Sequence, residues 1–309
     1  MAVFLSDYLP DTDAYSQQQI VAKGLDMHKE EANRRPFQLV EAADISAMYK
    51  PRVAFSHKGT YGHALIIAGS DETMGAALIS ANACLHAGAG LTTLSIPESG
   101  LAAMNTLLPE VMYAKREHFE ELSEAHIEKY NAIAVGPGLG AAQHALFRVV
   151  LSYKRAIIAD ADAINILAEN KKMLYELSPS SIITPHMKEF DRLFGTHKNW
   201  WDRLQTAISK AIELNIVIVL KNQYTFIIDQ KGRVAINATG NPAMAQGGMG
   251  DALTGIITAF LAQGYEARDA AILGVYFHGK AGDQLAEQKF SVTATELIMQ
   301  LSRTVKLHP

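Results

Sequence analysis

The sequence predicts an α/β protein with a mostly parallel central sheet, helices on both faces of that sheet and a hairpin at one edge. Three observations support this fold class. From Lys58 onward, short β-rich runs alternate with helical stretches, as in parallel sheets with crossover helices. Small and polar residues follow successive strands, where open parallel sheets bind ligands. The chain has 309 residues, 49% of them hydrophobic, which is enough for one large domain or two smaller ones.

The predicted elements follow a polar beginning. Residues 1–50 are weakly periodic and include the charged stretch HKEEANRRP, so we expect a leader or linker there, or the remnant of a preceding domain, and a catalytic domain over residues 51–309. The two strand-like runs of TFIIDQKGRVAIN flank a turn at Gly232, which predicts the edge hairpin. The expected parallel strands are ALIIAG, LTTLSI, AIAVG, AIIAD, SIITP and IVIVLK.

Composition and charge argue against several classes of partner. Lys and Arg total 28 and Asp and Glu total 32, and no basic cluster stands out that could follow a nucleic acid or an acidic membrane surface. No apolar run reaches the roughly 18 residues of a membrane span, and the first residues lack a secretory pattern. The lone cysteine, Cys84, lies in an apolar run that indicates a buried thiol. We therefore expect a cytoplasmic protein.

The strongest local signal is NPAMAQGGMGDALTGIITAFLAQG, which spans Asn241 to Gly264. Its apolar residues recur at helical spacing, so a helix should begin near Asp251 and stop at Gly264. The free N–H groups of that helix would face a loop of glycines, where a ligand can approach the backbone closely. This arrangement is typical of an anion site. Alternatively, Asp251 only caps the helix, and the local sequence leaves both interpretations open.

Five consecutive strands end in residues of functional type. Because the carboxyl ends of parallel strands meet at one edge of a sheet, we expect a ligand cleft there. Asp160 and Asp162 form a close carboxylate pair that could act on protons or metal, or could simply cap a helix, and we rank them below Asp251. The residues after the five strands are Ser70 with Gly75, PGLG, ADAIN, His186 with Glu189, and NQYT.

Three glycine-containing stretches differ in what they predict. GSDETMGAAL is not a Walker loop, because Gly69 and Gly75 are one residue too far apart and Ala76 replaces the lysine. HAGAGLTTL is a poor dinucleotide fingerprint, since its glycines end a helix and precede a strand. VGPGLG follows a strand, so Gly138 and Gly140 favour the backbone-lined wall of a site over a plain turn.

TPHMKEF predicts another helix start beside the cleft. Thr184 suits the N-cap and Pro185 the first helical position, which places His186 in the first turn and Glu189 one turn later on the same face. His186 could hydrogen-bond a ligand. Glu189 could order a Mg²⁺ ion through water, or both residues could be ordinary polar groups of a solvated helix start. No cluster of residues has the spacing of a zinc site.

With these stretches in order, the chain resembles the NAD(P)H-hydrate dehydratase family, whose members have a ribokinase-like α/β fold. The resemblance runs from about Lys58 to Gln300, or about four-fifths of the chain. It implies repair of damaged nicotinamide cofactors: the S-form of NADHX or NADPHX is dehydrated at the expense of ADP in most bacterial members, or ATP in eukaryotic ones. The matching stretches are HKGTYGHALIIAGS, MGAALISANACLHAGAGLTTL, VGPGLG, ADADAIN, ITPHMKEF, VLKNQYT and GNPAMAQGGMGDALTGII.

The resemblance also assigns roles to residues. Asp251 is similar to the family's general base, which takes the proton of the substrate hydroxyl while that hydroxyl attacks the terminal phosphorus, and we expect its pKa near the ordinary 4. The N–H groups of Gly248, Met249 and Gly250 correspond to an anion hole for the transferred phosphoryl group. In this family the phosphorylated hydroxyl then leaves as phosphate, which restores the ring double bond.

Two binding sets complete the comparison with the family. The stretch KNQYT, together with Gly250, matches the part that holds the adenylate group; its residues are Lys221, Asn222, Gln223, Tyr224 and Thr225. The positions that contact the hydrated dinucleotide correspond to Ala76, Gly138, Gly140 and His186, with Asp251. The chain departs from the family pattern at Asn222, Gln246 and Met187, where glycine, threonine and proline are common, which affects nucleotide preference more than chemistry.

Other interpretations remain open at this stage. A vitamin-type kinase of the same fold, acting on a pyrimidine or thiazole alcohol, would use the same anion hole and Asp251. His186 argues against it, because such kinases tend to have Asn at the equivalent position. A nucleotide-binding sensor without turnover is the other class. The resemblance further implies a homotetramer, a requirement for Mg²⁺ and a functional link to an NAD(P)HX epimerase.

Overall fold

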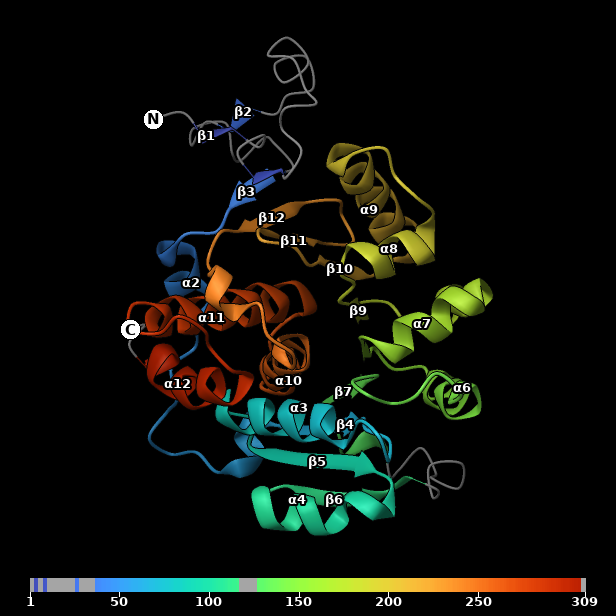
Figure 1. Ribbon diagram of the computed structural model, residues 1–309, viewed down its shortest axis with the longest axis vertical. Helices are drawn as coiled ribbons and strands as arrows, with labels where there is room; N and C mark the ends of the chain where they lie inside the picture. Colours follow the sequence, from blue (N-terminus) through green and yellow to red (C-terminus); the bar gives the residue numbers. More distant parts are fainter. Residues whose placement is uncertain (1–2, 5–7, 10–25, 28–36, 117–126, 307–309) are drawn as a thin grey trace.

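The computed structural model describes residues 3–4, 8–9, 26–27, 37–116 and 127–306. In this part of the chain, ten strands form one sheet in the order β3-β12-β11-β10-β9-β8-β7-β4-β5-β6, and only β11 runs antiparallel to its neighbours (Figure 1). The strands are β3 Phe37–Leu39, β4 His63–Ile67, β5 Leu91–Ile96, β6 Met112–Lys115, β7 Ala132–Val135, β8 Ile158–Ala159, β9 Ile182–Ile183, β10 Val217–Leu220, β11 Thr225–Ile228 and β12 Val234–Asn237. Two further strands, β1 Val3–Phe4 and β2 Asp26–Met27, pair with each other.

Helices cover both faces of the sheet (Figure 1). One face carries α2 Ala42–Met48, α3 Met74–His86, α4 Leu101–Leu107, α10 Met249–Ala262, α11 Ala267–Ala286 and α12 Ala294–Lys306; the other carries α6 His144–Ser152, α7 Asp162–Glu169, α8 Met187–Phe194 and α9 Trp200–Leu214. Short 3-10 helices are η4 Lys58–Tyr61, η5 Glu98–Gly100, η7 Lys171–Glu176 and η8 Pro242–Met244.

The strands bury side chains on both faces, as expected of a parallel sheet between two helical layers. In β4, Ala64 and Ile66 belong to the core under α3 and α10, whereas Leu65 and Ile67 belong to the core under α6 to α9. This period of two divides one continuous apolar run between two cores. The predicted α/β class and the six expected parallel strands are therefore confirmed.

The beginning of the chain differs from the expectation. Strand β3 lies within the segment expected as a leader, yet it pairs in parallel with β12, so the β11–β12 hairpin lies one strand inside the edge instead of at it. Ile45 of α2 is fully buried in the core. The expected boundary near residue 50 therefore does not coincide with the edge of the sheet. A three-residue strand is too short to give a periodic signal, which explains the difference.

Close packing between α3 and α10 fixes the position of the first turn of α10. Gly255 of α10 lies so near α3 that a Cβ atom there would stand 2.0 Å from the carbonyl oxygen of Ser80. The Ser80 hydroxyl oxygen is 3.0 Å from the Asp251 carbonyl oxygen and 2.9 Å from that of Ala76. The start of α10 is thereby held beside the start of α3, which follows β4.

Two smaller expectations can also be compared with the structure. Cys84 is fully buried, and burial raises the pKa of its thiol to about 12, so it is the core thiol that the sequence indicates. None of the helices in the described ranges has the length and apolar character needed to cross a membrane.

Candidate active site

The first turn of α10 leaves backbone donors free. Gly248 is the N-cap, with a φ of 88° in the left-handed region, and it has no side chain to cap the helix. The Ala252 N–H donates to the Gly248 carbonyl oxygen (2.9 Å) as the first bond along the helix, so the N–H groups of the four residues before Ala252 have no partner within it. Asp251 is the third helical residue, so it lies in the first turn and is not the N-cap.

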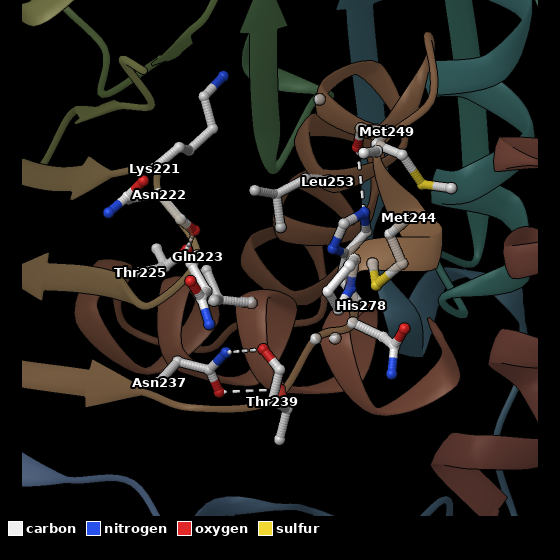
Figure 2. A pocket seen from close by; sticks show the side chains of 17 residues that line it. Lys221, Asn222, Gln223, Thr225, Asn237, Thr239, Met244, Met249, Leu253 and His278 are labelled. Atoms are coloured by element: carbon white, nitrogen blue, oxygen red, sulfur yellow. Dashed lines mark hydrogen bonds between the residues drawn. The ribbon is translucent and has the colours of Figure 1, made fainter. Parts of the chain in front are cut away.

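A cavity of about 480 Å³ opens beside this turn, and we call it the α10 cavity. The segments after β10 and β12 form two of its walls, and both strands run antiparallel to β11, so their carboxyl ends meet at one edge. Figure 2 shows the side chains of Lys221 and Asn222 on one side of the cavity and His278 on the other. A volume of this size is typical of small-molecule sites.

Most of the predicted adenylate-binding residues gather in the α10 cavity. The cavity is lined by Lys221, Asn222, Gln223 and Thr225, and also by Met249 and Gly250 of the predicted anion hole. Tyr224 is not part of this lining, because its ring packs edge-on against Tyr8, with the ring centroids 5.0 Å apart. The turn after β10 and the first turn of α10 therefore both line the α10 cavity.

A buried ion pair lies under this space. Lys221 Nζ is 2.9 Å from Asp160 Oδ1, and Thr254 Oγ1 donates to Asp160 Oδ2 over 2.7 Å. Burial by itself would raise the pKa of Asp160, but the Lys221 ammonium and these hydrogen bonds hold it below its ordinary value. A Cβ atom on Gly250 would stand 3.6 Å from Lys221 Nζ, so the pair lies directly against the first turn of α10.

The same pair influences Asp251. Burial and the nearby Asp160 carboxylate raise the pKa of Asp251 to about 6, while the Lys221 ammonium opposes them. The expected pKa near 4 is therefore wrong, because the sequence does not show that this carboxyl group is buried beside a second one. Asp251 remains mostly ionised at neutral pH and is a stronger base than an ordinary aspartate.

Three of the residues expected at the dinucleotide, Ala76, Gly138 and Gly140, lie outside the α10 cavity and follow β4 and β7 in the chain. The strand order reverses between these two strands, which is where open α/β sheets bind ligands. Gly138, with a φ of 57°, would place a Cβ atom 2.9 Å from Cβ of Ala76. The N–H of Gly140 donates to Asp162 Oδ2 over 2.8 Å. We group Ala76, Gly138 and Gly140 as one wall, because Gly138 lies against Ala76 and Gly140 follows it two residues later. Ser80 connects Ala76 of this wall to Asp251.

The start of α8 differs in detail from the expectation. The N-cap is His186, not Thr184, because Thr184 is fully buried at the end of β9. His186 Nδ1 accepts from the N–H groups of Lys188 (3.1 Å) and Glu189 (3.2 Å), and Glu189 Oε2 accepts from the His186 N–H (2.8 Å). These bonds form a capping box. The backbone of His186 also forms an isolated parallel β-bridge with that of Lys221, so this helix start stands beside the ion pair.

No dedicated metal cage is present in the ranges that the structure describes, since no three carboxylate, histidine or cysteine side chains converge. Glu189 is a single buried carboxylate whose pKa is raised by burial, against the opposing effect of Lys221. The donor set fits an ion such as Mg²⁺ that keeps most of its waters and is held chiefly by phosphate oxygens.

Comparison with known proteins identifies the relatives of this arrangement. A family model described as NAD(P)H-hydrate dehydratase matches residues 64–303. The chain belongs to the NAD(P)H-hydrate dehydratase family. It is 35% identical to the ADP-dependent (S)-NAD(P)H-hydrate dehydratase of Listeria monocytogenes over 259 residues, which is 82% of this chain and 90% of that protein.

Solved structures agree with the family assignment and with the ribokinase-like fold. A ribokinase-like superfamily protein from Enterococcus faecalis has a TM-score of 0.81 at 29% identity and covers 89% of this chain and 97% of that chain. The ADP/ATP-dependent NAD(P)H-hydrate dehydratase of Bacillus subtilis, co-crystallised with ATP and Mg²⁺, has a TM-score of 0.78 at 32% identity, over 87% of this chain and 98% of that chain.

Some relatives are much longer than this chain. The bifunctional NAD(P)H-hydrate repair enzyme of Moorella thermoacetica is 38% identical over 272 residues, which is 83% of this chain but 51% of that protein. The chain thus spans about half the length of the bifunctional members of the NAD(P)H-hydrate dehydratase family that it matches.

The sequence did not predict four polar residues that line the α10 cavity or contact the ion pair beneath it. Asn237, Thr239 and His278 line the α10 cavity, and Thr254 holds the buried Asp160. His278 and Thr254 lie within apolar helical runs, where a single polar residue resembles an ordinary core position. Asn237 is the last residue of β12, and its position at the end of a strand could have drawn attention to it.

Proposed function

We propose that this chain is an ADP-dependent (S)-NAD(P)H-hydrate dehydratase that returns hydrated NADH or NADPH to the intact cofactor while ADP becomes AMP and phosphate. The observation that carries the proposal is the position of Asp251. Its carboxylate lies in the first turn of α10, and Met249 and Gly250 of that turn line the α10 cavity. A base and preorganised donors at one point are what transfer of a phosphoryl group to a hydroxyl requires.

The nucleotide fits the α10 cavity in one direction. We infer that the adenylate group lies against the turn after β10, near Lys221, Asn222, Gln223 and Thr225, which line the cavity. Its terminal phosphate then reaches the N–H groups of Gly248, Met249 and Gly250. Tyr224 belongs to this segment in the sequence, but its side chain does not line the cavity.

The hydrated dinucleotide approaches from the other side of Asp251. The wall formed by Ala76, Gly138 and Gly140 is separate from the α10 cavity, which leaves that cavity to the nucleotide. His186 is half-exposed and stands beside Lys221, so its Nε2, which lies 3.5 Å from Glu189 Oε1, can also contact this second substrate. The two substrates would then meet at the carboxylate of Asp251.

The chemistry then has two stages. Asp251 takes the proton of the ring hydroxyl as that oxygen forms a bond to the terminal phosphorus, and AMP leaves with the electron pair of the broken P–O bond. Loss of the new phosphate and of one ring proton restores the double bond. A pKa of about 6 keeps Asp251 ionised at neutral pH and places it near the working pH, which favours a general base.

Mg²⁺ bound to the nucleotide phosphates would neutralise part of their charge. Glu189 would hold the hydrated ion through a water molecule, since one of its oxygens already accepts from the His186 N–H. The ATP-dependent version of the same reaction needs the same groups, and the choice between the two nucleotides is left to the assay.

The test is a direct assay. The protein is incubated with hydrated NADH, Mg²⁺ and either ADP or ATP, and the absorbance of the intact reduced nicotinamide is followed. We expect recovery of absorbance that depends on nucleotide and is faster with ADP. If neither nucleotide gives recovery, the proposed function is wrong.

The proposed setting is a cytoplasmic homotetramer that works with an NAD(P)HX epimerase. The bifunctional relatives, which are about twice as long as the matched segment, support the link to a second repair activity. Given an equal mixture of the two epimers, the chain alone should convert about half of the substrate quickly. Added epimerase should allow complete conversion, and sedimentation velocity should report four copies. Rapid full conversion without epimerase would contradict the assignment of S-specificity.

A further inference from the structure

His278 of α11 makes a hydrogen bond to the first residue of α10. Its Nε2 lies 3.1 Å from the Met249 carbonyl oxygen, and Figure 2 shows this contact at the wall of the α10 cavity. A carbonyl oxygen only accepts hydrogen bonds, so the ring proton is on Nε2. Burial lowers the pKa of His278 to about 4, which keeps the ring neutral with this single N–H.

The accepting carbonyl belongs to a peptide unit that also carries a donor of the proposed anion hole. The Met249 carbonyl and the Gly250 N–H form one planar peptide group. A hydrogen bond to the oxygen of that group fixes its orientation and polarises its N–H, because linked hydrogen bonds strengthen one another in a low dielectric. The Gly250 N–H faces outward from the helix start and has no partner along the helix.

Packing against α3 holds the first turn of α10, but the two glycines before this peptide contribute no side chain to the restraint. Gly248 offers no side-chain cap, and a Cβ atom on Gly247 would meet nothing within 4 Å. Such a stretch loses much conformational freedom when it is ordered, so a bond from a neighbouring helix has a larger effect here than in a capped helix. The next residue of α11, Gly279, is packed so closely that a Cβ atom there would stand 2.3 Å from Thr239 Oγ1. The donor is therefore held on a rigid support.

We propose that His278 is a positioning residue for the phosphoryl transfer: its Nε2–H orients and polarises the Met249–Gly250 peptide, whose N–H binds the terminal phosphate. The inference rests on the proposed function, because the reaction that His278 would assist is the proposed one. The binding test described below does not require that the protein catalyse this reaction. His278 does not touch the reacting atoms, and its effect passes through one backbone group.

Two substitutions separate this role from simple packing. His278→Met keeps a side chain of similar length but removes the donor, whereas His278→Gln keeps an N–H donor at a similar distance from the backbone. We expect the kcat of the Met variant to fall about tenfold, less than the loss of a whole oxyanion-hole donor, and that of the Gln variant to recover to within about threefold of the parent. A structural role alone would lower the stability of both variants and leave kcat unchanged.

His86 provides a matched control. Its Nδ1 lies 3.0 Å from the Asn82 carbonyl oxygen, also a backbone acceptor, at the opposite end of the α3–α10 pair. His86→Met removes the same kind of bond away from the proposed site and should leave kcat unchanged.

A binding measurement tests the inference even if the protein shows no dehydratase activity. Calorimetry with ADP and with AMP gives the contribution of the terminal phosphate to affinity. We expect the ratio of ADP to AMP affinity to fall about three- to tenfold in His278→Met and to stay near the parent value in His278→Gln and His86→Met. Equal ratios in the parent and the Met variant, or equal losses in the Met and Gln variants, would overturn the inference. Absence of activity in the parent would instead overturn the proposed function.

Discussion

The two ends of α10 each border a cavity of similar size. The N-terminal end faces the α10 cavity of about 480 Å³, and the C-terminal end faces a cavity of about 560 Å³, which we call the helix-end cavity. The helix-end cavity is lined by Tyr49, Arg52, His86, Phe260, Gln263 and Lys306, among others. Volume alone therefore does not distinguish the proposed site from its counterpart.

The backbone groups at the two ends differ in what they have available. In the helix-end cavity, Gln263 Nε2 donates to the carbonyl oxygens of Ala87 (3.1 Å) and Ala259 (3.0 Å), and Ser302 Oγ donates to that of His86 (3.0 Å). Those donors occupy carbonyl oxygens at the C-terminal ends of α3 and α10. At the α10 cavity, the N–H groups of the first turn have no partner among the described residues. The free donors, rather than the size of the cavity, indicate where an anion binds.

The largest expected effect of a single substitution is at Asp251. Asp251→Asn removes the base but keeps the shape of the side chain, so we expect kcat to fall by about two to four orders of magnitude while ADP binding persists. Rates from the absorbance assay and ADP affinities from calorimetry provide the comparison. Ser302→Ala, in the helix-end cavity, is the control and should keep the parent rate. A variant that loses ADP binding along with turnover would place Asp251 in nucleotide binding instead.

The next effect concerns the buried ion pair. Lys221→Met leaves the Asp160 carboxylate, which is only 2% exposed, without its cation, and breaking such a pair costs about 3–5 kcal/mol of the free energy of unfolding. Urea-induced unfolding measures this loss. Adding Asp160→Asn to Lys221→Met should recover most of the stability, because no uncompensated charge remains, yet nucleotide affinity should stay low. Equal stabilities of the single and double variants would show that the pair does not act as a unit.

Features with a local sequence pattern could be predicted, whereas contacts between distant residues could not. The six expected strands were predictable because they are β-rich runs bounded by glycine, proline or polar residues, whereas β6, with the sequence MYAK, and the three-residue β3 carry little pattern. The helix of Asp251 was predictable from its apolar spacing. The ion pair was not, since Asp160 and Lys221 are 61 residues apart and only the parallel order of β8, β9 and β10 brings them together.

The burial of a residue is also not visible in local sequence. The pKa of Asp251 depends on its burial and on Asp160, which belongs to a different strand end. His278 follows an apolar run of α11, so its contact with Met249 emerges only when α11 packs against α10. Motif order indicated which segments meet, but not which atoms.

The pH profile gives a smaller and more specific effect. Because Asp251 must be ionised to act as a base and its pKa is raised to about 6, kcat/KM should fall about tenfold per pH unit below about pH 6. Asp160→Asn removes the carboxylate that raises this pKa and releases the Lys221 cation that lowers it, so the acid limb should move to lower pH. Glu213→Gln, an exposed carboxylate on α9, should leave the limb in place. A limb that moves up in Asp160→Asn would contradict this electrostatic assignment.

The smallest effect tests the helix-end cavity itself. Gln263→Leu removes the side-chain amide that donates to the Ala87 and Ala259 carbonyl oxygens, and we expect a loss of about 1–2 kcal/mol in the free energy of unfolding. Because these bonds cap helices and bind no ligand, kcat and the KM for ADP should not change. Urea unfolding and steady-state kinetics on the same preparation decide between the two roles. A change in KM with intact stability would mean that both ends of α10 take part in binding, and free donors would then no longer distinguish the two cavities.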